Sequence, residues 1–430
     1  MRVFSICTKS ECLRRNNLSK LTIQYLSPLI AALNSEKKEI TMTHFVCLSP
    51  HFPPNFKTFW LRLKEANVQV LGISDSPWEE LGPELQTLLT EYYRVEDMHN
   101  LSQLEAACQH FIKRYGKIDR LESHNEYWLE TEAHLRTVFD IPGPRAENIR
   151  DIKSKERMKV LYRQGGIAVA EGAKVCTEKE CRDFIQKTGY PVVVKPDIGV
   201  GAARTWKLSS EEDLRQFIPF CDGTAYLIEE FIEGELYSFD GLTDSQGKIL
   251  FSASQYFNHG IMEIVNKDLD LYHMVLREIP AELEALGQKV VRTFGIRERF
   301  FHFEFFHRPD GRWVALEVNI RPPGGLSMDL FNYANDMDLY KGYAEMILTG
   351  ALHQTPSRNY FAAYIGRKHR QNYQLSHDEI MQKFSKEIIH HQNMAKIFYP
   401  VMGYGGYLVK SPDQQRIHEL VREIHALKEA

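Results

Sequence analysis

The pattern of the sequence changes at residues 141–144, and this change constrains the fold more than any other feature. Before it, short apolar runs at 45–48 and 68–73 alternate with helical spacing over 56–66 and 101–115. Alternation of strand and helix signals favours a parallel sheet covered by helices. The run Ile141-Pro142-Gly143-Pro144 then interrupts the pattern, and such a break is typical of a domain boundary.

Beyond this break, apolar runs follow one another with turn signals between them. Asp244-Ser245-Gln246-Gly247 and Pro309-Asp310-Gly311 each connect two such runs, and turns of this composition are typical of antiparallel hairpins. The second part is therefore predicted to be mainly antiparallel sheet with a few helices. The predicted fold class is α/β plus α+β, with an N-terminal doubly wound parallel-sheet domain in front.

A chain of 430 residues is too long for one ordinary domain, and the pattern divides it into five segments. We expect an N-terminal extension, a parallel-sheet domain, two α+β subdomains and a C-terminal α+β segment, over residues 1–41, 42–144, 145–235, 236–350 and 351–430. The extension carries basic residues but no continuous apolar run, so it does not read as a secretory signal. We expect it to be poorly ordered, as chain ends often are; a transit-like amphipathic helix and a translation start at Met42 are the alternatives.

Composition narrows the class of function. A net charge of −4 gives no reason to expect nucleic-acid or membrane partners, and no window of about 18 apolar residues predicts a transmembrane helix. The seven cysteines are scattered without a Cys-x-x-Cys pair, which suits buried thiols in a reducing cytosol better than zinc or disulfides. A cytoplasmic protein is therefore expected.

A phosphate-binding segment is predicted where the apolar strand 192–194 ends in Lys195. A loop of small residues follows: Gly199, Gly201, Ala202 and Ala203. Small residues let backbone N–H groups approach phosphate oxygens, and a lysine at a strand end can reach the same oxygens. A plain turn after a buried strand is the alternative. No helix opens with Gly-Lys-Ser/Thr, so this is not the Walker pattern.

A second segment, Tyr226 to Glu235, places acids between apolar positions. Strand alternation puts Leu227, Glu229 and Phe231 on one face. Such acids can accept hydrogen bonds from an adenine amine or a ribose hydroxyl, and backbone groups at the strand end can contact the adenine edge. Since exposed acids are common, a solvated edge strand is the alternative.

The sharpest signal is a pair of strands around the turn 309–311. An antiparallel pairing would bring Glu304 close to Glu317, and Asn319 shares the face of Glu317. Two carboxylates and an amide oxygen suit Mg²⁺, which retains waters and uses substrate phosphates as its remaining ligands. Arg321 is an even number of residues from Glu317 and Asn319, so it would lie on the same face, where its guanidinium adds a cation for phosphate oxygens. The alternative, a solvated polar face, is weakened by the apolar neighbours, because buried acids need a partner or a metal.

Taken in order over roughly residues 42–335, these segments resemble the ATP-grasp superfamily, and within it the bacterial carboxylate–amine ligases. The order of the segments carries the resemblance, together with Glu317-Val318-Asn319-Ile320-Arg321 and the Pro322-Pro323-Gly324-Gly325 that follows it. The resemblance implies an ATP-grasp fold of two α+β subdomains behind the N-terminal domain. Residues 145–235 would be the small or lid subdomain, and 236–350 the metal and catalytic subdomain.

The resemblance also implies a role for each matched position. The implied ATP contacts are Lys155, Lys195, Gly199, Gly201, Ala202, Glu229, Glu230, Phe231, Ile232 and Glu235. The implied ligands of Mg²⁺, or of Mn²⁺ as the alternative metal, are Glu304, Glu317 and Asn319. Lys195 and Arg321 are the implied catalytic residues, which would stabilise the transferring phosphoryl group. Lys153 competes with Lys155, and Glu235 stands one residue before the position of the family's ribose-binding glutamate, here Leu236.

The implied reaction is ATP-dependent ligation. A carboxylate is activated as an acyl phosphate and an amine then attacks it, which gives an amino-acid or peptide-like product. The implied partners are small-molecule carboxylate and amine substrates, and a homodimer is left open. Three alternatives remain: an ATP-grasp enzyme with a non-amine acceptor, a non-catalytic nucleotide-binding module, and a dinucleotide-dependent oxidoreductase. The last ranks low because no Gly-x-Gly-x-x-Gly follows the first strand.

The substrate pocket is less clearly marked in the sequence. Residues 123–126 follow a strand of the N-terminal domain, at the carboxyl end where open α/β sheets bind ligands. His259 is a second candidate, as a base or a substrate contact, although a packing role is commoner for a single histidine. Gly324-Gly325 is a third, through its backbone N–H groups.

Overall fold

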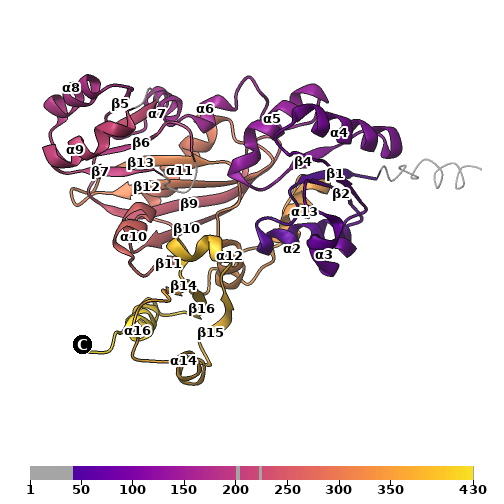
Figure 1. Ribbon diagram of the computed structural model, residues 1–430. Helices are drawn as coiled ribbons and strands as arrows, with labels where there is room; N and C mark the ends of the chain where they lie inside the picture. Colours follow the sequence, from indigo (N-terminus) through magenta and orange to yellow (C-terminus); the bar gives the residue numbers. More distant parts are fainter. Residues whose placement is uncertain (1–41, 200–203, 222–224, 430) are drawn as a thin grey trace, which may run out of the picture. The chain divides into compact units, whose positions relative to one another are not determined.

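The computed structural model describes residues 42–199, 204–221 and 225–429, so the predicted extension over 1–41 lies outside the described residues (Figure 1). From His44 onward the chain is one unit. Three sheets are present in the described part of this unit. No helix in these ranges is both long and apolar enough to cross a membrane.

The first sheet has four parallel strands, in the order β3-β2-β1-β4. They are β1 His44–Leu48, β2 Gln69–Ser74, β3 Glu91–Arg94 and β4 Arg120–Glu122. The helices that alternate with them are α2 Lys57–Glu65, α3 Gly82–Leu88, α4 Leu101–Tyr115 and α5 Leu129–Val138. The sequence did not predict β3, because it reads Glu-Tyr-Tyr-Arg and lacks an apolar run.

Alternate residues of β1 pack against helices on opposite faces of this sheet. Phe45 and Cys47 share a core with residues of α2 and α3. Val46 and Leu48 share a different core with residues of α4 and α5. Helices therefore cover both faces, which confirms the predicted doubly wound parallel-sheet domain.

The second sheet has four strands, in the order β5-β8-β6-β7, and every pairing is antiparallel. They are β5 Gly172–Val175, β6 Val192–Pro196, β7 Trp206–Leu208 and β8 Tyr226–Glu230. One face packs Val192 and Val194 against helices α8 Glu178–Thr188 and α9 Glu211–Phe217. By strand alternation, Lys195 and Glu229 lie on the other face.

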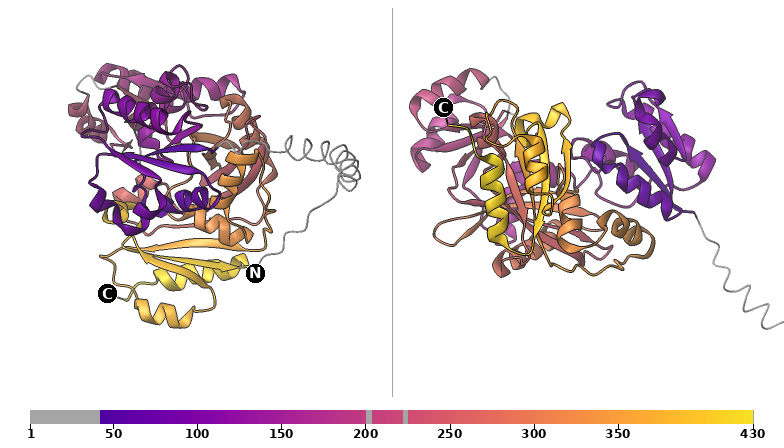
Figure 2. Two further views of the ribbon diagram at one scale, coloured as in Figure 1. Left: turned by 90° about the vertical axis from the view of Figure 1, so that its right-hand side faces the viewer. Right: turned by 90° about the horizontal axis from the view of Figure 1, so that it is seen from below.

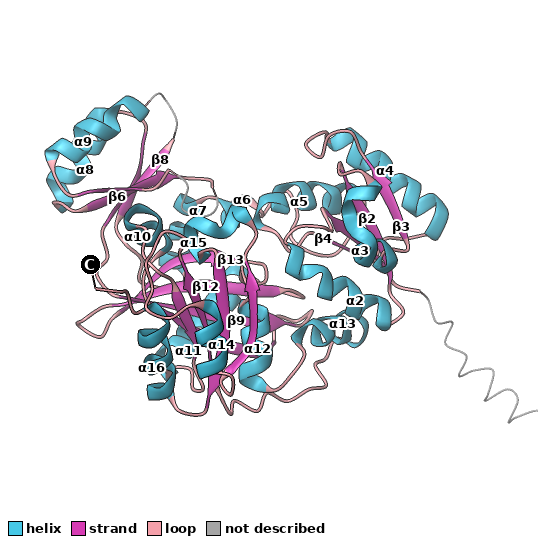
Figure 3. Cartoon of the chain, turned by 60° about the horizontal axis from the view of Figure 1, so that its bottom comes forward, coloured by secondary structure: helices cyan, strands magenta, loops and turns pink. Residues whose placement is uncertain are grey.

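The third sheet has eight strands, in the order β13-β12-β9-β10-β11-β14-β16-β15, and its pairings are antiparallel. Three of the strands, β13, β12 and β9, are labelled in Figure 3. The first five in chain order are β9 Glu235–Thr243, β10 Ile249–Phe257, β11 Tyr272–Val275, β12 Phe300–His307 and β13 Trp313–Asn319. The others, orange to yellow in Figure 2, are β14 Phe361–Arg367, β15 Ile388–Asn393 and β16 Gly405–Ser411. Strands from the predicted C-terminal segment thus extend the sheet that carries the predicted metal ligands, and the segment boundaries stay predictions.

The helices of this region are α10 Ile261–Lys267, α11 Ala281–Phe294, α12 Ser327–Asn335, α13 Leu339–Thr349, α14 His377–Lys383, α15 Tyr399–Met402 and α16 Gln414–His425. Helix α11 packs closely on β9 because Gly287 has no side chain: a Cβ there would lie 2.1 Å from Cδ1 of Phe239. Phe239 shares its core with Phe301 and Phe303 of β12. Alternation along β12 therefore turns His302 and Glu304 to the opposite face of the sheet.

Residues 150–164, which follow the boundary at 141–144, form two helices, α6 Arg150–Lys153 and α7 Lys155–Gln164. Ser154 between them has an extended backbone, and its hydroxyl accepts a hydrogen bond from the backbone N–H of Arg157. The same hydroxyl donates to the carboxylate of Asp197. The break therefore places Lys155 at the start of a helix, beside the loop that follows Lys195.

Candidate active site

A cavity of about 600 Å³ brings the predicted site residues together. Those that line it are Lys155, Lys195, Gly199, Glu229, Glu230, Phe231, Ile232, Glu235, Glu304, Glu317, Asn319 and Arg321. Gly201, Ala202 and Ala203 lie outside the described residues. Lys153 is not part of the lining; its Nζ instead donates to the backbone oxygen of Glu126 and lies 3.1 Å from Glu126 Oε1. Of the two competing lysines, Lys155 is therefore the one at the cavity.

Glu229 on β8 holds two lysines on the face that borders the cavity. Lys195 Nζ lies 2.5 Å from Glu229 Oε2, and Lys159 of α7 pairs with the other carboxylate oxygen. Burial acts to raise the pKa of Glu229, but the charges of the two lysines outweigh it and hold the pKa below its usual value. Two ammonium groups share one carboxylate, so this wall of the site carries a net positive charge. The side chain of Glu229 is engaged with the lysines, and its predicted contact to adenine stays a prediction.

Lys155 connects the phosphate segment to the predicted metal ligands. Its Nζ donates to the backbone oxygen of Gly199 at 3.2 Å and lies 3.4 Å from Glu317 Oε1. Lys159, which sequence reasoning missed, stands four residues later on the same helix face. Its Nζ also donates to the backbone oxygen of Ala170 at 2.9 Å. The sequence signal that could have identified Lys159 is its spacing of four residues from Lys155.

Glu304 on β12 and Glu317 on β13 are direct partners across the antiparallel pair. Like charges in this arrangement destabilise a sheet. Burial raises the pKa of Glu317 and the charge of Glu304 adds to the rise, while Lys155 opposes it. A divalent cation between the carboxylates would remove the repulsion, and Asn319 offers an amide oxygen from the same face of β13. The donor set therefore fits Mg²⁺.

The chain would supply only part of the coordination of that cation. The described residues contain no group of three or more His, Cys, Asp or Glu side chains placed to hold a metal. Mg²⁺ in nucleotide enzymes uses one or two carboxylates and takes its other ligands from phosphates and waters. Two carboxylates and an amide are consistent with that kind of site.

His302, which the sequence did not predict as a site residue, lies between Asp240 and Glu304 and contacts both. Its Nδ1 lies 2.6 Å from Asp240 Oδ1, and its Nε2 lies 3.2 Å from Glu304 Oε1. Burial acts to lower the pKa of His302, but Asp240 and Glu304 outweigh it and raise the pKa to about 9. Asp240 is the register partner of His302 on β9 and also accepts a hydrogen bond from Ser238. The sequence signal that could have identified His302 is its position two residues before Glu304, on the same face of one strand.

The predicted adenosine-binding segment leads into the start of β9, which pairs with the His307 end of β12 and not with its His302 end. Glu230 is bonded to Glu171 through both its backbone N–H and its side chain. Lys207 Nζ lies 3.6 Å from the centroid of the Phe231 ring. Glu235 pairs in register with His307 and accepts a hydrogen bond from the Tyr237 hydroxyl at 3.3 Å. The predicted roles of this segment in adenine and ribose binding stay predictions.

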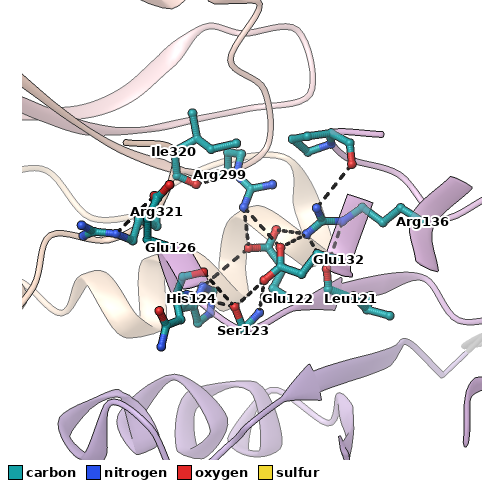
Figure 4. Close-up of polar contacts among 12 residues, drawn as sticks. Leu121, Glu122, Ser123, His124, Glu126, Glu132, Arg136, Arg299, Ile320 and Arg321 are labelled. Carbon is teal, nitrogen blue, oxygen red and sulfur yellow. Dashed lines mark hydrogen bonds and ion pairs between the residues drawn. The ribbon is translucent and has the colours of Figure 1, made fainter. Parts of the chain in front are cut away.

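The N-terminal domain reaches the cavity through Glu126, just after β4. Figure 4 shows Glu126 beside Arg321, whose Nε lies 3.6 Å from Glu126 Oε2. The same view shows Arg299 between the two domains: its Nε donates to the backbone oxygen of Ile320, and its Nη2 lies 3.3 Å from Glu122 Oε2. The N-terminal domain therefore contacts Arg321 directly and also fixes the backbone residue before it.

The other predicted substrate-pocket residues divide into two groups. His259 lines the cavity and its Nδ1 lies 3.4 Å from Glu263 Oε2. Gly324 and Gly325 are not among the cavity residues, and the backbone oxygen of Gly325 accepts a hydrogen bond from Asn55 Nδ2 at 2.6 Å. The glycine pair thus contacts the N-terminal domain.

Comparison with known proteins agrees with this arrangement. Residues 188–329 match the ATP-grasp domain family. The L-arginine-specific L-amino acid ligase of Bacillus subtilis is 26% identical over 242 residues, which cover 54% of this chain and 58% of that relative. The chain thus spans little more than half the length of this curated relative.

Solved structures share the fold at low sequence identity. The L-amino acid ligase from Bacillus licheniformis has a TM-score of 0.70 and 15% identity, and the likeness covers 90% of this chain and 98% of that one. The biotin carboxylase domain of the 2-oxoglutarate carboxylase from Hydrogenobacter thermophilus, in complex with MgADP, has a TM-score of 0.65 and 15% identity over 89% of each chain. The predicted ATP-grasp fold behind a parallel-sheet domain is confirmed, and residues 188–329 within it are similar to the ATP-grasp domain family.

Proposed function

We propose that this protein is an ATP-dependent ligase that activates a carboxylate as an acyl phosphate and joins it to an amine. The observation that carries the proposal is the convergence, in one cavity, of Lys155, Lys195 and Arg321 with the opposed carboxylates on β12 and β13. The family match supports it, as do relatives whose names describe L-amino acid ligases. A module that only binds a nucleotide would not need a carboxylate pair and an arginine beside the lysines.

Each charged residue has a defined task in this proposal. Lys195 and Lys155 contact the phosphates of ATP, while Arg321 stabilises the negative charge of the transferring phosphoryl group. When held by Glu304, Glu317 and Asn319, Mg²⁺ or Mn²⁺ supplies Lewis-acid polarisation of the phosphate oxygens. No protein nucleophile is needed, because positioning and electrostatic stabilisation account for this kind of phosphoryl transfer.

The proposed reaction has two displacements. In the first, an oxygen of the substrate carboxylate attacks the γ-phosphorus in line, the bond to the bridging oxygen breaks, and ADP leaves. In the second, the amine nitrogen attacks the acyl carbon, phosphate leaves, and the amine loses a proton. Small carboxylates and amines are the expected partners, the cytosol is the expected compartment, and a homodimer stays open.

Carboxylate-dependent release of ADP tests the proposal. The protein is incubated with ATP and MgCl₂ and a panel of amino acids and other small carboxylates, each with and without an amine. Hydroxylamine replaces the amine in a parallel series, because it converts an acyl phosphate into a stable hydroxamate. We expect ADP and hydroxamate to form together, and only when a carboxylate is present.

Two results would contradict this proposal. ADP release at the same rate with every carboxylate and with none would show hydrolysis without activation. Nucleotide binding without any turnover would favour the non-catalytic module. A thiol or hydroxyl acceptor that outperforms all amines would retain the activation step and correct the acceptor.

A further inference from the structure

We propose that His302 makes this site prefer Mg²⁺ to Ca²⁺, because it holds one oxygen of Glu304 and leaves the other oxygen to bind the cation. In this proposal His302 is a positioning residue, since it acts through Glu304 and does not itself touch the cation. The inference rests on the proposed function, in which Glu304 is a metal ligand. It goes further by assigning the choice of metal to a residue outside the predicted ligand set.

The imidazole ring of His302 is held at both of its nitrogens. Nδ1 lies 2.6 Å from Asp240 Oδ1, and Nε2 lies 3.2 Å from Glu304 Oε1. Both partners are carboxylates, which accept hydrogen bonds, so both ring nitrogens donate. A planar ring that is bonded through two of its atoms cannot turn without breaking a bond. The hydrogen bond to Glu304 therefore has a fixed direction.

Asp240, which orients this ring, is itself fixed by its neighbours in the sheet. It is the register partner of His302 on β9 and is fully buried. Its other oxygen accepts hydrogen bonds from the Ser238 hydroxyl and from Gln255 Nε2, the latter at 3.5 Å. Gln255 Oε1 accepts in turn from His273 Nδ1 at 2.8 Å. Both oxygens of Asp240 are thus engaged, and such outer partners fix the orientation of the groups that bind a metal.

The hydrogen bond from His302 makes the two oxygens of Glu304 unequal. The bond is made to Oε1, so this oxygen has a lone pair engaged and Oε2 is the better ligand for a cation. Glu317, on the opposite strand, is contacted instead by the ammonium of Lys155 at 3.4 Å. A lysine carries its charge on a flexible stem. The site therefore combines one carboxylate in a fixed orientation with one that can adapt.

Mg²⁺ and Ca²⁺ respond differently to a carboxylate that offers one oxygen in a fixed place. Mg²⁺ requires nearly ideal octahedral geometry at about 2.0–2.1 Å and keeps several waters. Ca²⁺ takes about six to eight oxygens at about 2.3–2.6 Å and often binds both oxygens of a carboxylate. The fixed Glu304 thus suits Mg²⁺ and leaves Ca²⁺ short of a ligand. Release of Glu304 from His302 removes this difference, because both oxygens can then approach the larger ion.

His302 could instead serve only the packing of the sheet, and three variants separate the two roles. His302→Asn keeps an amide near the position of Nδ1, where it can bond to Asp240, but it is too short to reach Glu304. His302→Gln places an amide near the position of Nε2, where it can still donate to Glu304. His273→Asn is the matched control, because His273 is a buried histidine of the same hydrogen-bonded chain that contacts Gln255 and not Glu304.

Displacement of Mn²⁺ measures the choice of metal without any turnover. Each protein is mixed with Mn²⁺ and a smaller amount of ADP, and bound Mn²⁺ is followed by electron paramagnetic resonance while Mg²⁺ or Ca²⁺ is titrated in. We expect Mg²⁺ to displace Mn²⁺ from the wild type at a lower concentration than Ca²⁺ does. Thermal melting and ADP binding in EDTA check that each variant is folded.

The variants should differ in their preference between the two metals. In His302→Asn the affinity for Mg²⁺ should fall by about 10- to 100-fold, the range typical of losing a partner that orients a metal ligand. The affinity for Ca²⁺ should change much less, because a freed carboxylate can bind this ion with both oxygens. His302→Gln and His273→Asn should retain most of the preference for Mg²⁺.

Three results would overturn the role of His302. The first is a wild type that binds Mn²⁺ but does not distinguish Mg²⁺ from Ca²⁺. The second is an equal loss of affinity for both ions in His302→Asn, which would indicate general damage to the site. The third is the same change of preference in His273→Asn, which would assign the effect to packing.

Carboxylate-dependent ADP release, measured on the same proteins, separates this inference from the proposed function. A preference that survives in His302→Asn, together with normal ADP release in the wild type, overturns the role of His302 and retains the function. A loss of preference in His302→Asn, with no ADP release from the wild type with any carboxylate, refutes the function and retains the role of His302. A wild type that binds no Mn²⁺ overturns the metal assignment and this inference with it.

Discussion

Two buried groups of charged residues in this chain are alike in composition but differ in arrangement. The first lies at the end of β4 and comprises Glu122, Glu132, Arg136 and Arg299 (Figure 4). Its two carboxylates and two guanidinium groups balance, and the central pair, Arg136 and Glu132, is fully buried at 2.6 Å. None of the four lines the cavity.

The second group surrounds the cavity and comprises Lys155, Lys159, Lys195, Glu229, Glu304 and Glu317. Its three lysines and three carboxylates are equal in number but locally unbalanced, because two lysines share Glu229 while Glu304 and Glu317 lie opposite each other. Such local imbalance is unfavourable in an empty protein and is favourable once a polyanion and a cation bind. The comparison teaches that buried charge by itself does not mark a site; local imbalance beside a cavity does.

The largest effect is expected where the imbalance is greatest, at the opposed carboxylates. Glu317→Gln should reduce Mg²⁺-dependent ADP formation about 1,000-fold or more, because a charged metal ligand is lost. The fold should survive, since the substitution also removes the repulsion with Glu304. Steady-state kinetics measures the loss of activity, and thermal melting checks that the fold survives. Activity close to that of the wild type would refute the metal assignment.

A change of the same kind in the balanced group should act on stability instead. Glu132→Gln leaves Arg136 and Arg299 without a full counter-charge in a buried place, which should cost about 3–5 kcal/mol of the free energy of unfolding. Urea denaturation measures this loss. The folded fraction should bind ADP with wild-type affinity, and a selective loss of nucleotide binding would show that the two groups are coupled.

Lys195→Ala should weaken the use of ATP by a smaller factor. Loss of one charged hydrogen bond to a phosphate corresponds to about 10- to 100-fold in kcat/KM for ATP, and Lys159 remains to neutralise Glu229. Lys179→Ala, a change on the exposed face of α8, is the matched control. Wild-type kinetics in Lys195→Ala would remove this residue from the phosphate site.

The smallest effect is expected in the pH dependence of stability. It comes from His124, an uncharged side chain beside the first group of charged residues. Burial, partly opposed by Glu132, lowers the pKa of His124 to about 3. The native protein therefore keeps this histidine uncharged while the unfolded chain protonates it below about pH 6.5. Its contribution to stability is complete above pH 6.5 and is lost as the pH falls towards 3, by about 1–2 kcal/mol between pH 6.5 and 5.

His124→Asn is the matched variant for that experiment. The backbone of His124 has a positive φ of 56°, which asparagine tolerates better than most residues. Urea denaturation at pH 6.5 and pH 5 should show a shallower loss of stability in the variant than in the wild type. Equal losses in both proteins would show that His124 does not titrate differently on unfolding.

The predictable part of the structure was set by local pattern. The turn at 309–311 and the alternation on either side of it determine which residues of β12 and β13 meet, so the pairing of Glu304 with Glu317 could be predicted. The parallel sheet was predictable for the same reason, except for β3, whose Glu-Tyr-Tyr-Arg lacks the apolar signal of a buried strand.

The part that could not be predicted depends on contacts between distant segments. Helix α7 begins at Lys155 because Ser154 is bonded to Asp197, and no helical propensity within 151–164 indicates that break. The same holds for the contact of Glu126 with Arg321, which joins two segments far apart in the sequence. His302 and Lys159 form an intermediate case, since their spacing from Glu304 and Lys155 was visible but their partners were not.

The continuity of the third sheet determines how the chain can be shortened. Strand β11 pairs along its length with β14, whose other neighbour is β16. A chain ending near residue 350, as the predicted segments suggest, would leave β11 as an exposed edge with open N–H and C=O groups. It would also uncover Met274, which is buried among residues of β14 and α16. Such a fragment should therefore self-associate through the exposed edge of β11.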